Sequence, residues 1–217
     1  MKEYHKITTV FKRDPKTKYK TLLIGEYTEP EFEYLKDNTW LFTEKIDGTN
    51  IRVMWKEGKL FFGGKTDNAQ IPVFLYDKLN ELFTAELMKE VFSDTDVCLY
   101  GEGYGAKIQK GGGNYIPDGV NFILFDVKIG NWWLKRFDVE DIAYKLELKT
   151  VPYIGEGNLE TMVNTVRLGF KSKIGKVEHR AEGIVARPKV ELIGRNGHRI
   201  ITKIKHKDFK EQKWLSK

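Results

Sequence analysis

The sequence is poor in cysteine, and it has neither a long apolar run nor an apolar leader. The single cysteine, Cys98, excludes a disulfide within the chain, and the flanking Val97 and Leu99 favour a buried, inert thiol. No run approaches the roughly 18 to 20 apolar residues that a membrane span needs, and no signal region is visible. We therefore expect a cytoplasmic protein, in the host cytoplasm if the chain is viral, with no membrane partner.

Two common kinds of functional site are also missing from the sequence. The four histidines, His5, His179, His198 and His206, show no metal-ligand spacing with one another or with Cys98, which argues against a zinc site. The pattern GxxxxGK[ST] does not occur, which excludes the usual phosphate-loop kinase.

Positive charge is in mild excess. Lysine and arginine number 37 against 31 acidic residues, and the formal charge of +6 suits a polyanionic partner without requiring one. The excess is greatest in residues 12–20 and 194–217, although a solvated basic face is an equally good interpretation of the first cluster. Since 41% of the residues are hydrophobic, the chain can bury a core, and we predict one domain over residues 1–217.

The apolar pattern predicts an α+β fold with antiparallel sheets flanked by helices. Period-two or continuous apolar runs predict strands at 21–24, 40–45, 51–55, 59–62, 97–102, 121–129, 132–136, 183–187 and 200–204. Helical spacing predicts one helix within residues 72–92 and a second that begins at Asp138 as N-cap. A third helix is expected from Asn158 to Leu168, with Gly169 as its C-terminal cap.

The segment KIDGTN, residues 45–50, brings a lysine out of an apolar strand and into a tight turn. Asp47 and Gly48 are a favoured pair for a two-residue hairpin, so the segment predicts a hairpin that joins strands 40–45 and 51–55. This geometry can present the amine of Lys45 as a nucleophile. Most such hairpins carry no chemistry, and the segment alone leaves a purely structural role open.

Four further segments combine chemistry-bearing residues with apolar strands. They are LYGEGYG at 99–105, FILFDV at 122–127, AEGIVARP at 181–188 and ITKIKHKDF at 201–209. In order and approximate spacing, the five segments resemble the motifs of the covalent nucleotidyltransferases, which include ATP-dependent RNA and DNA ligases and mRNA capping guanylyltransferases. The first motif of that superfamily is a nucleophilic Lys-x-Asp-Gly.

The closest resemblance is to the T4 RNA ligase 2-like branch, because Asn50 stands where DNA ligases and capping enzymes usually have Arg. The resemblance implies the nucleotidyltransferase fold of a ligase catalytic domain, which is ATP-grasp-like. It also places Asp47, Gly48 and Asn50 in the nucleotide site beside the nucleophile Lys45. Few residues follow the last motif, so we expect no appended C-terminal domain.

Attack by a lysine on the α-phosphate of ATP needs a neutral amine, so its pKa must fall well below the roughly 10.4 of free lysine. Lys203 and Lys205 lie two residues apart on a predicted strand and therefore share a face. Cations there lower the pKa of a nearby amine and contact phosphate. The resemblance assigns both lysines to the last nucleotidyl-transfer motif, where they meet the α-phosphate and orient the leaving pyrophosphate.

Two glutamates are candidates for a metal site. A triphosphate calls for Mg²⁺, with Mn²⁺ as an alternative, held by a few carboxylates, phosphate oxygens and water. Glu102 lies between Gly101 and Gly103, which we expect to allow close approach of a ligand. In the RNA ligases such a residue contacts the ribose or organises the metal, and Glu182 matches the motif whose glutamate supports metal binding.

The resemblance also implies a site for the adenine base. Phe125, which precedes Asp126, is favoured over Phe122 as the stacking ring, and Ile184 or Val185 is expected on the other face of the base. Glu44 resembles the residue whose backbone helps to read adenine.

One residue departs from the family pattern. In GGKTDNAQIP, Lys65 stands where Arg is usual, so it lacks the bidentate guanidinium fork. Arg52 is the nearby alternative.

The resemblance thus implies an ATP-dependent RNA ligase. Lys45 takes AMP from ATP, passes it to a 5′-phosphate end, and a 3′-hydroxyl then seals the strand. The expected partner is RNA, with DNA as an alternative, and the expected state is a monomer. A DNA nick ligase, a guanylyl-transferring enzyme and a non-catalytic nucleic-acid-binding module remain alternatives. The N-terminal stretch and the tail HKDFKEQKW are candidate surfaces for end recognition.

Overall fold

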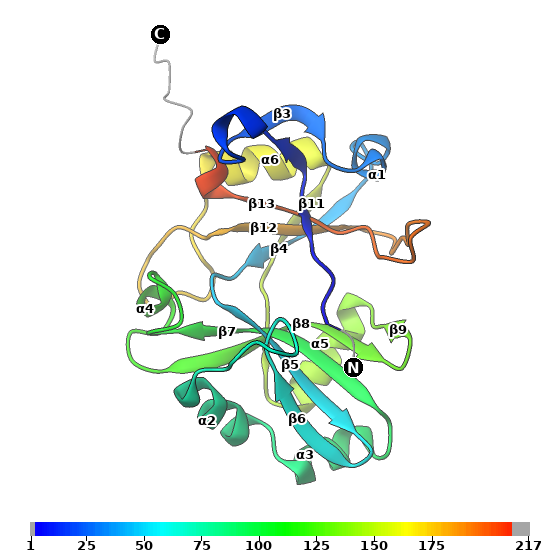
Figure 1. The fold of residues 1–217 in the computed structure, drawn as a ribbon, viewed down its shortest axis with the longest axis vertical. Coiled ribbons are helices and arrows are strands. Elements are labelled where there is room, and N and C mark those ends of the chain that lie inside the picture. Colours follow the sequence, from blue (N-terminus) through cyan, green and yellow to red (C-terminus); the bar gives the residue numbers. More distant parts are fainter. Residues whose placement is uncertain (1–2, 210–217) are drawn as a thin grey trace. The chain divides into compact units, whose positions relative to one another are not determined.

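The computed structural model describes residues 3–209, and the chain divides into two compact units. The first unit consists of the N-terminal residues up to Tyr4 together with 47–151 and 174–177, and the second of 5–46, 152–173 and 178 onward. Figure 1 shows the elements and labels most of them. The prediction of one domain stays a prediction, and residues 210–217 of the candidate tail lie outside the described residues.

The first unit is built on a sheet in the order β10-β8-β7-β5-β6, with β9 paired to β8. All pairs are antiparallel except β10 with β8. The strands are β5 (Thr49–Lys56), β6 (Lys59–Gly63), β7 (Val97–Gly105), β8 (Val120–Ile129), β9 (Trp132–Trp133) and β10 (Lys149–Thr150). The helices are α2 (Val73–Leu82), α3 (Ala85–Phe92), α4 (Gly112–Tyr115) and α5 (Arg136–Lys145).

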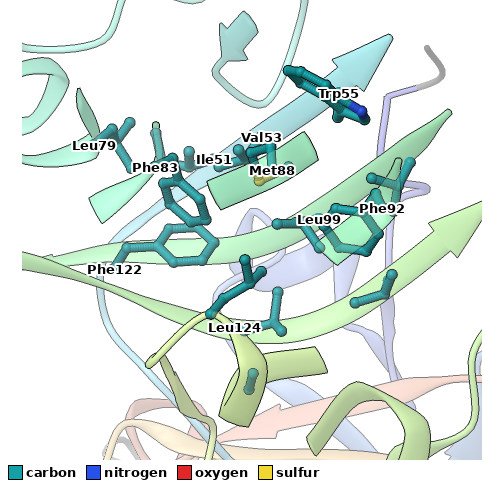
Figure 2. Packing of buried hydrophobic residues seen from close by; sticks show 14 of the residues in the cluster. Ile51, Val53, Trp55, Leu79, Phe83, Met88, Phe92, Leu99, Phe122 and Leu124 are labelled. Carbon is teal, nitrogen blue, oxygen red and sulfur yellow. The ribbon is translucent and has the colours of Figure 1, made fainter. Parts of the chain in front are cut away.

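One hydrophobic cluster holds this unit together, and most of it is visible in Figure 2. Alternate residues of β5, namely Ile51, Val53 and Trp55, supply one wall of the cluster. Leu79 of α2 and Met88 of α3 are among the helical residues that pack against them. Burial of each such side chain contributes about 1.5 to 3 kcal/mol to stability. This energy holds the apolar face of the sheet against the helices, so polar side chains lie on the other face.

Two helix predictions in this unit were wrong in detail. The helix expected within 72–92 is two helices, because the buried Phe83 is extended at the end of α2 and the Thr84 side chain caps α3 by accepting from the backbone of Leu87. The second predicted helix begins at Arg136, so Asp138 lies in its first turn, where a carboxylate favours the helix dipole. The strand predicted over 132–136 is reduced to β9.

The second unit contains a sheet in the order β1-β13-β12-β4-β11, in which only β1 with β13 is parallel. Its strands are β1 (Thr8–Thr9), β4 (Trp40–Lys45), β11 (Tyr153–Gly157), β12 (Gly183–Pro188) and β13 (Thr202–Lys205). A two-stranded sheet joins β2 (Phe11–Arg13) and β3 (Leu22–Tyr27). The helical elements are α1 (Pro30–Tyr34), α6 (Leu159–Leu168), η1 (Pro15–Thr17) and η2 (His206–Phe209).

The third predicted helix is confirmed as α6, with both of its caps. Asn158 accepts from the backbone N–H of Thr161 at 2.8 Å, and Gly169 ends the helix with a φ of 80°. The buried side of α6 packs with residues of β4, β12 and β13 in a second hydrophobic cluster. The opposite face of the large sheet therefore carries the polar side chains that alternate with that core.

The predicted hairpin at Asp47-Gly48 was wrong. Strand β4 pairs with β11 and β12, whereas β5 pairs with β6 and β7, so the segment connects two different sheets. The boundary between the two units falls between Ile46 and Asp47. Both long edges of each strand are already occupied by other partners, which leaves no edge for a hairpin. The fold class is nevertheless confirmed as α+β with mainly antiparallel sheets. No helix in residues 3–209 is long and apolar enough to cross a membrane.

Candidate active site

In the second unit, three neighbouring strands place two lysines on either side of a glycine. Gly183 of β12 is paired with Lys45 of β4 on one side and with Lys205 of β13 on the other. Burial alternates along β13, where Thr202 and Ile204 are buried and Lys203 and Lys205 are not, so the predicted shared face of the two lysines is confirmed. A Cβ on Gly183 would clash with the Ile204 carbonyl and lie 2.8 Å from the Cα of Lys205.

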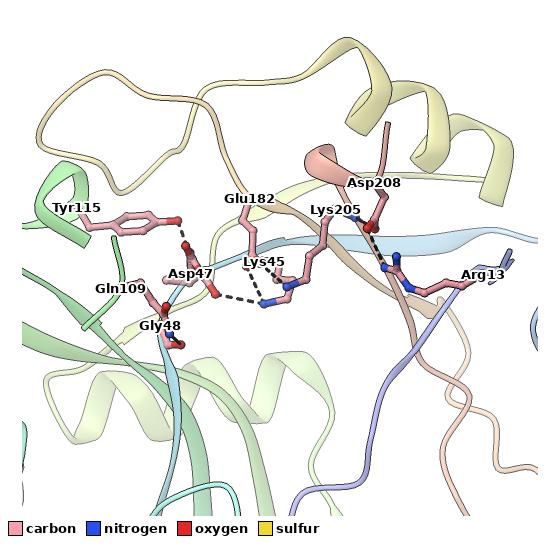
Figure 3. Close-up of polar contacts among 10 residues, drawn as sticks. Arg13, Lys45, Asp47, Gly48, Gln109, Tyr115, Glu182, Lys205 and Asp208 are labelled. Atoms are coloured by element: carbon pink, nitrogen blue, oxygen red, sulfur yellow. Dashed lines mark hydrogen bonds and ion pairs between the residues drawn. The ribbon is translucent and has the colours of Figure 1, made fainter. Parts of the chain in front are cut away.

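One carboxylate binds both of these lysines (Figure 3). Glu182 accepts from Nζ of Lys45 at 2.7 Å through Oε2 and from Nζ of Lys205 at 2.6 Å through Oε1. The three side chains are only 11–21% exposed. The backbone carbonyl of Glu182 also accepts from His206 N at 2.8 Å, which ties it to η2. We call Lys45, Glu182 and Lys205 the lysine cluster.

Electrostatics keep the central carboxylate ionised. Burial raises the pKa of Glu182, but the ammonium of Lys45 and hydrogen bonds from Lys205 and Lys45 outweigh it, so the pKa lies below the usual glutamate value. A single negative charge thus partly neutralises two cations on one face of the sheet.

Glu44 and Ile184, which were both expected near the adenine base, point toward the core of the second unit. Glu44 is buried, and its carboxylate accepts from Ser172 Oγ at 2.6 Å and from Lys173 N at 2.8 Å. Ile184 is fully buried in the second cluster, and its assignment as a base contact stays a prediction. The alternative, Val185, lies one residue further on the opposite face and pairs with Lys203. A role for the Glu44 backbone stays a prediction.

In the first unit, Asn50 of β5 is directly opposite Glu102 of β7. The Oδ1 atom of Asn50 is buried and has no hydrogen-bond partner within residues 3–209. We expected Gly101 and Gly103 to leave room for a ligand, but the space beside both glycines is filled by the core. A Cβ on Gly101 would meet the Phe122 ring, and one on Gly103 would lie 2.6 Å from Leu75. Their small size serves packing against the core, and only the face of Glu102 and Asn50 is available for ligand chemistry.

The turn at Asp47 and Gly48 is held by a segment that sequence reasoning missed. Tyr115 of α4 accepts from Asp47 N at 3.2 Å, and Gln109 donates to the Gly48 carbonyl at 3.0 Å. A Cβ on Gly48 would lie 2.7 Å from Cγ of Glu102, so this position has space only for glycine. The glycine run 111–113 is the one feature of the sequence that marks this segment.

Arg52 and Lys65 occupy contrasting environments. Arg52 is buried, donates from Nε to the Gly64 carbonyl at 2.8 Å and forms an ion pair with Asp67 at 2.8 Å. Lys65, between those two partners in sequence, is exposed. Arg52 thus anchors the loop that presents Lys65, and which of the two meets a nucleotide stays a prediction.

Phe125 lies at an irregularity of β8. The pairing with β7 shifts between Asp126 and Leu124, which leaves Phe125 as the extra, bulged residue. Phe122, the other candidate for the ring that stacks on adenine, belongs to the hydrophobic cluster of the first unit, so Phe125 stays the candidate. Sequence reasoning missed Tyr4, whose ring packs edge-on against Phe125 at 5.1 Å and whose hydroxyl donates to Asp126 at 2.7 Å.

Among residues 3–209, no group of three or more His, Cys, Asp or Glu side chains is placed to hold a metal ion. The two glutamates expected at a metal belong to different units, Glu102 to the first and Glu182 to the second. Since Mg²⁺ is commonly held by one or two carboxylates with substrate phosphates and water, either carboxylate by itself has the chemistry to bind Mg²⁺ that arrives with a nucleotide.

Comparison with known proteins identifies the fold and the family. The Naegleria gruberi RNA ligase with PPi superposes with a TM-score of 0.63 at 18% identity, over 97% of this chain and 59% of that chain. A variant of that ligase with ATP and Mn gives 0.63 at 19% identity, over 95% and 59%. A second variant with ATP and Mn gives 0.63 at 18% identity, over 81% and 52%. The chain thus spans little more than half the length of these ligases, and at such identity the likeness shows the fold.

The family follows from a separate comparison. No curated protein sequence matches the chain. A family model described as RNA ligase matches residues 38–205, which include the first four motif segments and, in the fifth, Lys203 and Lys205. The chain therefore belongs to the RNA ligase family.

Proposed function

We propose that this protein is an ATP-dependent RNA ligase with Lys45 as its nucleophile. The amine of Lys45 attacks the α-phosphate of ATP, a P–N bond forms, pyrophosphate leaves and the amine loses its proton. The AMP then passes from Lys45 to a 5′-phosphate end of RNA. A 3′-hydroxyl attacks that activated end, which forms the phosphodiester and releases AMP.

The lysine cluster is the observation that supports this proposal most strongly. Lys45 and Lys205 share the carboxylate of Glu182, and Lys203 lies on the same face of β13 as Lys205, as a nucleophile and phosphate-binding cations require. The bond between Glu182 and Lys45 also orients the amine. A triphosphate can compete with Glu182 for Lys205, which would bring its phosphates to the face of the sheet on which the Lys45 amine lies.

Residues of the first unit are among the proposed contacts to the nucleoside. Phe125 offers a ring for the adenine, and Val185 of the second unit is the proposed aliphatic contact. The buried Oδ1 of Asn50 lacks a donor among the described residues, and such an acceptor costs about 1 to 3 kcal/mol until it is satisfied. A ribose hydroxyl, or a water bound with the nucleotide, has the chemistry to supply that donor.

Glu102 and Glu182 are the carboxylates proposed to hold Mg²⁺ or Mn²⁺. The ion, when bound, neutralises triphosphate charge and stabilises the leaving pyrophosphate. Both relatives described with ATP also carry Mn, which supports a nucleotide and a divalent metal as cofactors. Lys203 and Lys205 are proposed to hold phosphate oxygens in line with the Lys45 amine.

The test is covalent labelling. The protein is incubated with Mg²⁺ and α-labelled ATP, and transfer of label is followed on a denaturing gel. We expect label on the wild type and on Lys56→Ala, a control at an exposed lysine of β5, but none on Lys45→Ala. Equal labelling of Lys45→Ala, or an unlabelled wild type, contradicts the proposal.

Substrate range is tested separately. Labelling by ATP rather than GTP, and sealing of RNA rather than DNA nicks, are the expected results. Preference for GTP or for DNA would instead identify a guanylyl-transferring enzyme or a DNA ligase. We expect the active protein to be a monomer, which size-exclusion chromatography with light scattering checks.

A further inference from the structure

The connection between β2 and β3, residues 14–21, is a basic loop that presents an aromatic ring to solvent. Tyr19 is 62% exposed, and Lys16, Lys18 and Lys20 around it are exposed as well. Within residues 3–209, none of these three ammonium groups takes part in an ion pair. The loop therefore combines uncompensated positive charge with an uncovered ring.

The basic loop is held in one conformation by its own hydrogen bonds. The Asp14 carbonyl accepts from the N–H groups of Thr17 at 3.2 Å and Tyr19 at 3.0 Å, and the Asp14 side chain accepts from Lys16 N at 2.8 Å. Lys18 and Tyr19 have φ values of 54° and 61°, a left-handed conformation that residues other than glycine and asparagine rarely adopt. Backbone strain of this kind persists only where the surroundings impose it, and it occurs mostly at functional positions. Tyr19 is thus exposed on an ordered loop.

The basic loop is also connected to the lysine cluster through a buried carboxylate, and Figure 3 shows the part of this connection that runs from Arg13 through Asp208 to Lys205. Arg13 donates to the Tyr19 carbonyl at 3.3 Å and forms an ion pair with Asp208 at 2.7 Å. The other oxygen of Asp208 accepts from the backbone N–H of Lys205 at 3.0 Å, and only 3% of its side chain is exposed. The loop and the end of β13 therefore share one anchor, and a strand bound to the loop is bound to the same framework that positions Lys205.

We propose that the basic loop binds a single-stranded segment of the RNA substrate, with one base stacked on Tyr19 and neighbouring phosphates on Lys16, Lys18 and Lys20. An aromatic ring flanked by cations matches the alternation of base and phosphate along a single strand. Stacking is tolerant of sequence, which suits an enzyme that joins ends of varied sequence. The inference rests on the proposed function and adds a place for the strand outside the nucleotide site.

The first test removes the ring and keeps the backbone. Asparagine tolerates the left-handed conformation, so Tyr19→Asn preserves the loop, and Tyr34→Asn is the matched control at an 87% exposed tyrosine of α1. Binding of a fluorescein-labelled single-stranded RNA is measured by anisotropy. The Kd is expected to rise about 5- to 150-fold for Tyr19→Asn, the range for loss of one stacked base. Tyr34→Asn is expected to leave it unchanged, and Tyr19→Trp to retain tight binding.

The second test removes charge. Alanine replaces Lys16, Lys18 and Lys20 together, and the control replaces the exposed lysines Lys56, Lys59 and Lys89. The slope of log Kd against log salt is expected to fall by about 2 for the loop variant, since each phosphate contact of a single strand contributes about 0.7. The control slope stays at the wild-type value.

Labelling with α-labelled ATP on the same preparations separates the two proposals. The loop variants are expected to form lysyl-AMP at the wild-type rate and to seal RNA slowly at limiting substrate. Equal Kd values for Tyr19→Asn and Tyr34→Asn overturn the role of the loop, as does binding of anionic vesicles in preference to RNA. A wild type that binds RNA through Tyr19 but takes no label overturns the ligase proposal alone.

Discussion

The lysine cluster makes a quantitative prediction for Glu182→Gln, a substitution that keeps shape and removes charge. Glutamine can accept from one lysine, but its amide then turns a donor toward the other ammonium, and two cations remain close together. Each charge-assisted contact contributes about 1.5 to 3 kcal/mol when well buried and less where water reaches it. With contacts of 2.7 and 2.6 Å among side chains 11–21% exposed, we expect the free energy of unfolding at pH 7 to fall by about 2 to 3 kcal/mol.

The same substitution should remove part of the pH dependence of stability. The pKa of Glu182 is lower in the folded protein than the ordinary value of 4.5, so its contribution is complete above that value and is lost as pH falls through the folded pKa. The difference in unfolding free energy between wild type and Glu182→Gln is therefore expected to be constant from pH 7 to about 5. It then shrinks as the medium becomes more acidic.

Urea unfolding followed by tryptophan fluorescence measures both effects, because the chain has 5 tryptophans. The control is Glu178→Gln, whose ion pair with Lys171 at 2.9 Å joins side chains more than 70% exposed and should contribute almost nothing. A difference below about 0.5 kcal/mol for Glu182→Gln, or one equal to that of the control, would refute the idea that the cluster stabilises the fold. A difference that does not change between pH 7 and pH 3.5 would refute the assigned titration.

Three further substitutions test the supports around the site. Tyr4→Phe deprives the buried Asp126 of one donor and should lower the unfolding free energy by about 1 to 3 kcal/mol, as measured in urea. Asn158→Ala removes the cap of α6 and should cost about 1 kcal/mol, visible as a lower Tm, whereas Asn158→Asp should not. Gly183→Ala forces a Cβ against the Ile204 carbonyl, so it should lower the unfolding free energy by about 1 to 3 kcal/mol and reduce lysyl-AMP formation. Unaltered labelling and stability would show that β12 and β13 can move apart at no cost.

Local signals predicted the parts of the fold that depend on neighbours in sequence. The caps of α6 and the extents of β4, β5 and β12 follow from side chains within a few residues of each element. The connection at Asp47-Gly48 was mispredicted because a turn preference says nothing about which strands fill the edges on either side. Here β11, β12, β6 and β7 fill them, and all but β6 come from distant parts of the chain.

The face of a strand was the harder part of the site to predict. Alternation assigned Lys203 and Lys205 correctly to one face, because two residues of the same type stand in period two. For Ile184 and Val185 both side chains are apolar, so the sequence does not show which of them meets α6 and which meets the lysines. A shift of one residue exchanges the two faces, and only the pairing of Ile184 with Ile204 in the core decides between them.

The segment KIDGTN therefore depends on two independent sets of contacts. Lys45 is held by its own sheet, through the pairing with Gly183 and the ion pair with Glu182. Two residues further on, Asp47 and Gly48 are held in the other unit by a tyrosine hydroxyl and a glutamine amide. Because these contacts share no residue, the position of the amine and the path of the turn can be disturbed separately. The motif alone therefore determines neither the position of the Lys45 amine nor the path of the turn, because each depends on residues from other parts of the chain.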